Sequence, residues 1–200
     1  MNSNKMQPMK TQGLLVMVLL AVTLVACAKK DKATSTHGGE ANSPRPTVGT
    51  STAKVDVLAF IDYQCPFCSS NAKELLAVAD KHKDVMRLRV VNLPLDVHAN
   101  SVVLAKGAVA AQKHGKWRAY YLKILGMESA NRDSVIGWAV DAGLDAKAFK
   151  ADLDGREMAD VVAADVAMAG ALGVTGTPSY IVNGGLLQGA IDGAAWDKLV

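Results

Sequence analysis

The sequence predicts an α/β domain, and three observations support this class. Two β-branched and apolar stretches, residues 54–61 and 85–93, flank a segment whose apolar residues recur at helical spacing. Residues 99–171 follow helical spacing throughout, and short apolar runs return near the C-terminus. The chain has 200 residues, of which 50% are hydrophobic, so it is long enough for one domain with a buried core.

The N-terminal segment is typical of an export signal rather than of the fold. A polar start with two lysines precedes an apolar run, residues 14–26, which is shorter than the roughly 20 residues that cross a bilayer. Residues 1–26 are therefore predicted to be a signal peptide. The sequence Leu24-Val-Ala-Cys27 resembles a bacterial lipobox, which implies cleavage before Cys27 and acylation of its sulfur. The alternative is an inert cysteine at the end of the apolar run.

Residues 27–52 are predicted to be a flexible linker, because they are rich in Ser, Thr, Gly, Pro and Ala and contain almost no large apolar side chain. The folded domain is then expected over residues 53–200. Without residues 1–26 the chain carries 20 basic and 19 acidic residues, and no basic patch stands out, so no nucleic-acid partner is predicted.

Along the domain, the strand predicted for residues 54–61 leads to a helix that ends near Lys81–Lys83, and residues 85–93 form a second strand. Residues 99–171 predict four or five helices, with Asp133 or Ser134 capping one and Asp145 capping the next. Asn183-Gly184 between apolar runs predicts a hairpin. Asp192 is the expected cap of a short last helix.

The stretch Asp62-Tyr-Gln-Cys65-Pro-Phe-Cys68 carries the candidate chemistry. Its two thiols lie two residues apart where the first strand meets the helix. Unpaired backbone N–H groups and the positive end of the helix dipole favour a thiolate at Cys65. Cys68 lies one turn further on and is expected to be less exposed. Pro66 suits the first helical position, because its missing N–H has no helical partner there.

Three other interpretations of Cys65 and Cys68 remain open at this point. A structural zinc site needs four ligands, and the histidines of the domain occur singly rather than at ligand spacing. A copper site on the same scaffold would require a well-placed histidine. A purely structural disulfide would close a very short loop and stabilise little. If Cys27 is acylated, Cys65 and Cys68 are an even pair in an exported protein, where disulfides persist.

Four motifs together, DYQCPFC, LPLDVH, HGKW and GVTGTPSYIVNG, resemble the DsbA-like branch of the thioredoxin-fold thiol–disulfide oxidoreductases over about residues 54–200. The resemblance implies a thioredoxin fold with an inserted helical domain at about residues 99–171. It also implies Cys65 as the nucleophile and Cys68 as the resolving thiol. Thr177–Pro178 is the implied cis peptide bond, whose backbone pairs with the substrate. A glutaredoxin is disfavoured, since Cys65 and Pro178 lie 113 positions apart.

The chain departs from this family in one respect. Many relatives have a buried acid six residues before the first cysteine, where this chain has Ala59. Asp62 is expected nearer the surface end of the strand, as a partial substitute. His98 matches a recurring family position, and a structural hydrogen bond is expected there rather than a catalytic role.

The sequence therefore predicts a lipid-anchored, extracytoplasmic enzyme that exchanges disulfides with exported proteins. It would need no cofactor and no metal, act as a monomer, and exchange electrons with an unidentified membrane redox partner. The isomerases that share a threonine before the cis proline carry an N-terminal dimerisation domain, for which the predicted linker leaves no room. A monomer and the oxidase direction are therefore favoured over a reductase or isomerase. A metal-binding or purely structural lipoprotein is the remaining alternative.

Overall fold

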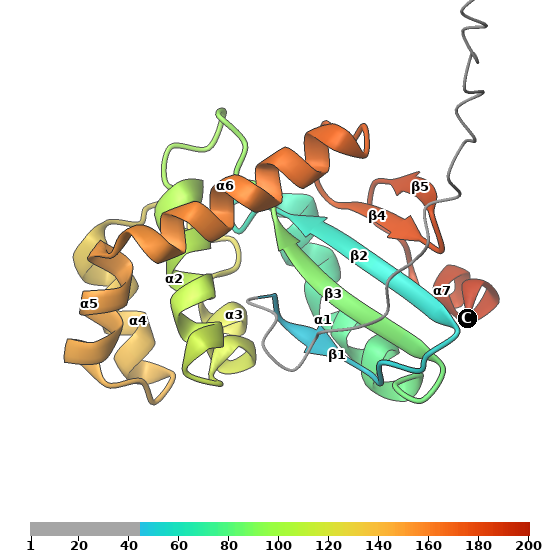
Figure 1. The fold of residues 1–200 in the computed structure, drawn as a ribbon, viewed down its shortest axis with the longest axis horizontal. Coiled ribbons are helices and arrows are strands. Elements are labelled where there is room, and N and C mark those ends of the chain that lie inside the picture. Colours follow the sequence, from blue (N-terminus) through green and yellow to red (C-terminus); the bar gives the residue numbers. More distant parts are fainter. Residues whose placement is uncertain (1–44) are drawn as a thin grey trace, which may run out of the picture. The chain divides into compact units, whose positions relative to one another are not determined.

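The computed structural model describes residues 45–200, which form a five-stranded mixed sheet with helices on both faces (Figure 1). The strand order is β1-β3-β2-β4-β5; β2 and β3 are parallel, and the other three neighbouring pairs are antiparallel. The strands are β1 (Thr47–Val48), β2 (Val55–Ile61), β3 (Met86–Asn92), β4 (Ser179–Val182) and β5 (Gly185–Gln188).

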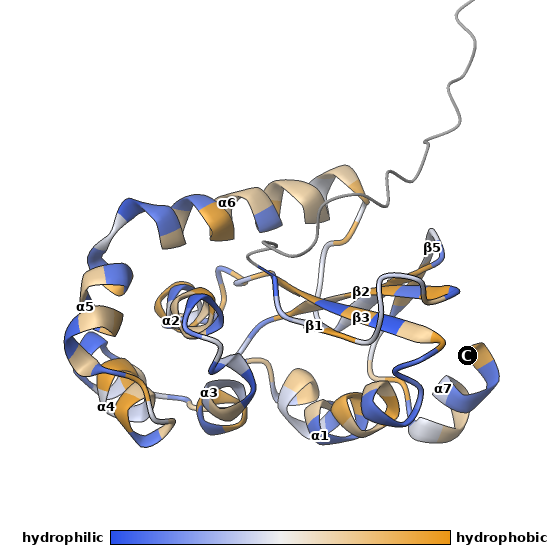
Figure 2. Ribbon diagram, turned by 60° about the horizontal axis from the view of Figure 1, so that its bottom comes forward, coloured by the Kyte–Doolittle hydropathy of each residue, from blue (hydrophilic) through white to orange (hydrophobic). Residues whose placement is uncertain are grey.

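Helices cover both faces of the sheet, and most of them lie in one insertion between two strands. Figure 2 shows α1 and α7 on one face and α6 on the other. Between β3 and β4 the chain forms five helices, in agreement with the predicted helical insertion over about residues 99–171. The helices are α1 (Pro66–Lys81), α2 (Ser101–Lys113), α3 (Trp117–Ile124), α4 (Arg132–Asp141), α5 (Ala146–Asp154), α6 (Arg156–Ala171) and α7 (Gly193–Leu199).

Alternating residues of β2 supply the two faces of the sheet. Val57, Ala59 and Ile61 belong to the large apolar cluster that includes α1 and the insertion. Phe60 packs instead into the smaller cluster that includes α6. This alternation places Ala59 on the same face as Cys68, which also belongs to the large cluster.

The predicted hairpin between β4 and β5 is present. Asn183 and Gly184 both have positive φ, 48° and 90°, as a two-residue type I′ turn requires. Asn183 also fixes the turn to the neighbouring strand, since its side-chain oxygen accepts a hydrogen bond of 2.8 Å from the backbone of Asp56. The hairpin thereby holds β4, and the Thr177–Pro178 segment before it, against β2.

The predicted end of the linker at residue 52 is wrong, because the fold begins earlier in the chain. Residues 45–52 belong to the fold: β1 pairs with the outer edge of β3, and Val90 donates a backbone hydrogen bond of 2.9 Å to Pro46. Arg45 also forms an ion pair of 2.6 Å with Asp165 on α6. A strand of two residues has no readable period, and its pairing depends on an edge formed far along the chain. The predicted signal peptide, Cys27 and residues 28–44 lie outside the described residues.

A second correction concerns the start of α4. The capping residue is Asn131, rather than the predicted Asp133 or Ser134. Asn131 accepts a hydrogen bond from the Ser134 backbone, and the Ser134 hydroxyl oxygen accepts one from the Asn131 backbone, each of 2.9 Å. The helix therefore begins earlier than its apolar pattern indicates, with Ser134 as the reciprocal partner of a capping box. The predicted caps Asp145 and Asp192 are confirmed.

None of the helices within residues 45–200 combines the length and the apolar character needed to cross a membrane.

Candidate active site

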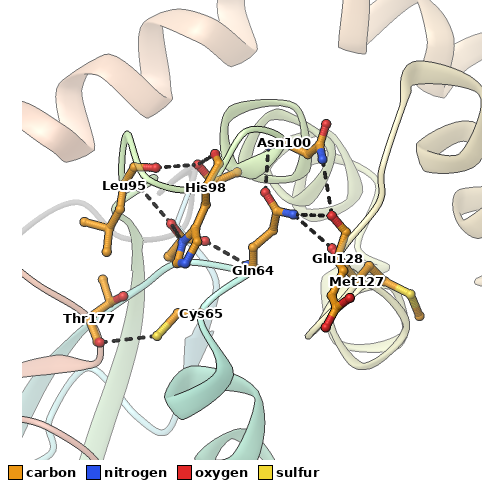
Figure 3. Close-up of polar contacts among 10 residues, drawn as sticks. Gln64, Cys65, Leu95, His98, Asn100, Met127, Glu128 and Thr177 are labelled. Carbon is orange, nitrogen blue, oxygen red and sulfur yellow. Dashed lines mark hydrogen bonds and ion pairs between the residues drawn. The ribbon is translucent and has the colours of Figure 1, made fainter.

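Cys65 lies at the junction of strand and helix, as predicted. It is the N-cap of α1, and Pro66 occupies the first turn of that helix. The sulfur of Cys65 donates a hydrogen bond of 3.3 Å to the backbone carbonyl of Thr177 (Figure 3). The first cysteine therefore faces the segment that leads into β4, although the two positions are 112 residues apart.

Cys68 lies one helical turn beyond Cys65, and both are free thiols. Their exposed fractions are 2% for Cys68 and 4% for Cys65, so the predicted difference in exposure is small. The difference between them is one of position. Both belong to the large apolar cluster, but Cys65 is the N-cap residue of α1, whereas Cys68 lies within the helix.

Burial changes the acidity of Cys68. Loss of solvation raises the pKa of its thiol to about 12, and the neighbouring Cys65 sulfur adds to the rise. A backbone hydrogen bond at Asp62 and the side chain of Thr177 act in the opposite direction. Cys68 is therefore a thiol at neutral pH, and it must lose a proton before it can attack a mixed disulfide.

The Thr177–Pro178 peptide bond is cis, as the resemblance implies. The carbonyl of Thr177 accepts the hydrogen bond from Cys65, so the predicted substrate-binding residues do lie beside the cysteine pair. The Thr177 hydroxyl oxygen is buried and makes no well-formed hydrogen bond with the described residues. It lies near enough to Cys68 to lower the pKa of that thiol.

The expectation that Asp62 lies near the surface is wrong. Its side chain has no exposed area, and its carboxylate accepts hydrogen bonds from the backbones of Gln64 (2.8 Å) and Leu95 (2.7 Å). His98 Nδ1 lies 2.8 Å from the same carboxylate, which is the structural hydrogen bond expected for that histidine. These partners satisfy a buried charge, and their positions in the sequence could not be known beforehand.

Ala59 is fully buried in β2, opposite Tyr180 of β4. It faces the cluster that contains Cys68, so the position of the missing acid is an apolar one in this chain. The carboxylate of Asp62, a buried acid three residues further along, is instead occupied by hydrogen bonds from Gln64, Leu95 and His98.

Gln64, the residue directly before Cys65, has contacts that the sequence did not indicate. Its amide group bonds to the backbone of Asn100 and to the carbonyls of Met127 and Glu128, as Figure 3 shows. The available signal was a polar residue in a loop between two buried elements. Nothing in that signal identifies the partners, which lie 36 to 64 positions away.

Large apolar side chains are exposed between the two cysteines and in the loop that is bonded to the active-site segment. Phe67, between the cysteines, is 67% exposed, and Val97, in the loop that contacts Asp62, is 82% exposed. Within residues 45–200, no group of three or more His, Cys, Asp or Glu side chains is arranged to hold a metal ion.

Comparison with known proteins gives one family model that matches most of the chain. The model, described as thioredoxin, matches residues 41–200. A probable disulfide bond formation protein D from Bacillus anthracis is 24% identical over 206 residues, covering 96% of this chain and 94% of that protein. The Na(+)/H(+) antiporter NhaA from Herminiimonas arsenicoxydans is 28% identical over 145 residues, or 72% of this chain. The chain spans only about a fifth of the antiporter relatives, 23% of this one.

Solved structures share the fold. A thioredoxin-like oxidoreductase from Silicibacter pomeroyi is 29% identical, with a TM-score of 0.70 over 79% of this chain and 91% of that one. The thiol-disulfide exchange protein α-DsbA2 from Wolbachia pipientis is 20% identical, with a TM-score of 0.70 over 80% and 89% of the two chains. A periplasmic thioredoxin-like protein from Salmonella enterica is 22% identical, with a TM-score of 0.67 over 80% and 90%. The fold is therefore the DsbA-like form predicted from the sequence.

Proposed function

This chain belongs to the thioredoxin family, and we propose that it acts outside the cytosol as a thiol–disulfide oxidoreductase on exported proteins. One observation carries the proposal: Cys65, at the start of α1, faces the carbonyl before the cis proline, with Cys68 buried behind it. Such an arrangement can receive a substrate sulfur at Cys65 while Cys68 waits as the second thiol.

In the oxidising direction, a substrate thiolate attacks the Cys65 sulfur of the Cys65–Cys68 disulfide. The bond between the two cysteines breaks, and Cys68 leaves as a thiolate that takes up a proton. A second substrate thiolate then attacks the substrate sulfur of the mixed disulfide, and Cys65 leaves. The substrate loses two electrons to form its disulfide, and the pair is left as a dithiol.

In the reducing direction the same steps run backwards: Cys65 attacks a substrate disulfide, and Cys68 then displaces the reduced substrate. We favour the oxidase direction and a membrane redox partner that reoxidises the pair. Reductase or isomerase activity is the second candidate. It has the support of Thr177 before the cis proline, the residue type found at this position in isomerase and reductase relatives.

The proposed location is the cell envelope, with the acylated Cys27 as a lipid anchor in a bacterial membrane. The apolar run before Cys27 supports export, and one relative of the same fold is described as periplasmic. Mass spectrometry of the protein from its native host tests the anchor. A mature N-terminus at Cys27 with acyl chains is expected, and a free Cys27 thiol would contradict it.

Mixed-disulfide trapping tests the activity. The Cys68→Ala variant, expressed with its own signal sequence, should accumulate disulfide-linked complexes with exported proteins, because no second thiol can release them. The double variant Cys65→Ala/Cys68→Ala is the matched control and should form none. If Cys68→Ala accumulates no more disulfide-linked complexes than the double variant, an enzymatic role is contradicted. Cys65 and Cys68 would then be explained as a structural disulfide.

The reduction potential of the Cys65–Cys68 pair decides the direction. Equilibration with glutathione buffers should give a value near about −120 mV for a strong oxidant, and one near about −270 mV would indicate a reductase. Titration of the reduced protein with zinc and copper ions tests the remaining alternative. Stoichiometric binding at micromolar metal would favour a metal carrier over the enzyme.

A further inference from the structure

Two polar side chains of the loop before Cys65 are bonded to loops from elsewhere in the chain. We call these the rim loops: residues 93–100, between β3 and α2, and residues 125–131, between α3 and α4. Asp62 contacts the first rim loop. Gln64 contacts both, as Figure 3 shows. The contacts therefore arise within three residues of the candidate nucleophile.

Gln64 is matched to its partners as both acceptor and donor. Its Oε1 accepts a hydrogen bond of 2.7 Å from the backbone N–H of Asn100. Its Nε2 donates to the carbonyls of Met127 (3.2 Å) and Glu128 (2.8 Å). A side-chain amide provides both functions in one planar group, whereas a carboxylate of the same size can only accept.

Asp62 holds the other part of the first rim loop. Its carboxylate accepts from the backbone of Leu95, and His98 Nδ1 lies 2.8 Å away. A carboxylate only accepts, so the proton of this contact is carried by the histidine nitrogen. Gly126 adds a backbone bond of 2.8 Å to the carbonyl of Tyr63, which ties the second rim loop to the same segment.

The rim loops bear on how a substrate reaches Cys65. The cysteine is only 4% exposed, so a polypeptide that delivers a sulfur to it must rest on the surrounding segments. One of these segments carries Val97, which is 82% exposed, and Phe67 is 67% exposed beside the cysteine. A small reagent can reach the sulfur without occupying these positions.

We propose that Asp62 and Gln64 are positioning residues that hold the two rim loops at a fixed place relative to Cys65, and so determine reaction with polypeptide substrates. Neither side chain takes part in bond formation. The inference rests on the proposed function, because it concerns the reaction of Cys65 with proteins.

The central test compares two reactions in Gln64→Glu and Gln64→Met. Glutamate keeps the size but places a charge against two carbonyls, and methionine removes all three hydrogen bonds. We expect reaction of the oxidised protein with reduced, unfolded ribonuclease A to slow about tenfold, since Gln64→Glu loses two hydrogen bonds and Gln64→Met loses three. Alkylation of reduced Cys65 by iodoacetamide should stay within about twofold of the unaltered protein. Gln112→Glu, which makes the same change at a half-buried position near the C-terminal end of α2 and outside the rim loops, is the matched control.

A fall in both rates together would overturn the proposal, since Gln64 would then act on the cysteine itself. An unchanged rate with the unfolded protein would also overturn it. Asp62→Asn offers one acceptor oxygen to three donors. If it folds, its reaction with ribonuclease A should slow while its alkylation by iodoacetamide stays unchanged.

Hydrogen exchange separates this proposal from the proposed function. In oxidised Gln64→Met, the Asn100 amide should exchange at least about tenfold faster, because it has lost its acceptor. The Leu95 amide, held by Asp62, should be unchanged. An unaltered exchange rate of the Asn100 amide in Gln64→Met would contradict the proposed positioning role of Gln64. Absence of any reaction between the unaltered oxidised protein and reduced ribonuclease A would instead contradict the oxidase activity of the proposed function.

Discussion

Removing the side chain of Arg45 should destabilise the domain, even though the sequence assigned this residue to the linker. Asp165, its partner, has no exposed area, and the Arg45 side chain is 19% exposed. Asp165 would keep two hydrogen bonds from Asn92 but lose the ion pair with Arg45. Breaking a buried ion pair by removing one member costs about 3–5 kcal/mol. Because Arg45 is partly exposed, we expect about 2–3 kcal/mol for Arg45→Met.

Urea unfolding of the oxidised protein measures this cost. With a slope of about 2 kcal/mol per molar urea, the midpoint should fall by about 1–1.5 M. Arg45→Lys keeps the charge without the guanidinium geometry, so its urea midpoint should lie between those of Arg45→Met and the unaltered protein. Arg156→Met removes an exposed arginine whose partner Asp160 is four residues away, and its cost should stay below about 0.5 kcal/mol.

The reasoning is refuted if Arg45→Met unfolds at the same urea concentration as Arg156→Met. In that case residue 45 would not belong to the cooperative fold, and the linker would extend as the sequence predicted. The same comparison applies to a chain that starts at residue 53, which lacks both Arg45 and β1. That chain should be at least as unstable as Arg45→Met.

Three further predictions concern the cysteine pair and its surroundings. Burial raises the Cys68 pKa from 9.0 to about 12, so the free energy of unfolding of the reduced protein should fall by up to about 4 kcal/mol as pH rises from 9 to 12. In urea unfolding over the same pH range, reduced Cys68→Ala should lose less of its stability than the unaltered protein. Thr177→Val should raise that pKa further and slow the Cys68-dependent release of a mixed disulfide about fivefold in stopped-flow measurements, while unfolding changes by less than about 1 kcal/mol. Ala59→Glu should cost about 3 kcal/mol in urea unfolding at pH 7 and less at pH 4, where the buried acid is neutral; equal cost at both pH values would contradict this.

Local sequence patterns were sufficient to predict those features that depend only on residues adjacent in the sequence. The strand–helix junction at Cys65, the Asn183-Gly184 turn and the caps Asp145 and Asp192 were all predicted and are all present. Each depends on the conformational preferences of a few consecutive residues. The sequence also determined the α/β class, because apolar periods of two and 3.6 distinguish strands from helices.

The tertiary structure alone decided where the polar groups of the core lie. Asp62 and Asp165 look like surface residues in the sequence, yet both are fully buried. Apart from the neighbouring Gln64, their donors are Leu95, His98, Arg45 and Asn92, which are 33 to 120 positions away. A buried charge is tolerated only where the fold brings donors to it, and those donors meet only after the chain has folded. For the same reason β1, the contacts of Gln64 and the position of Thr177 beside Cys65 are properties of the folded chain.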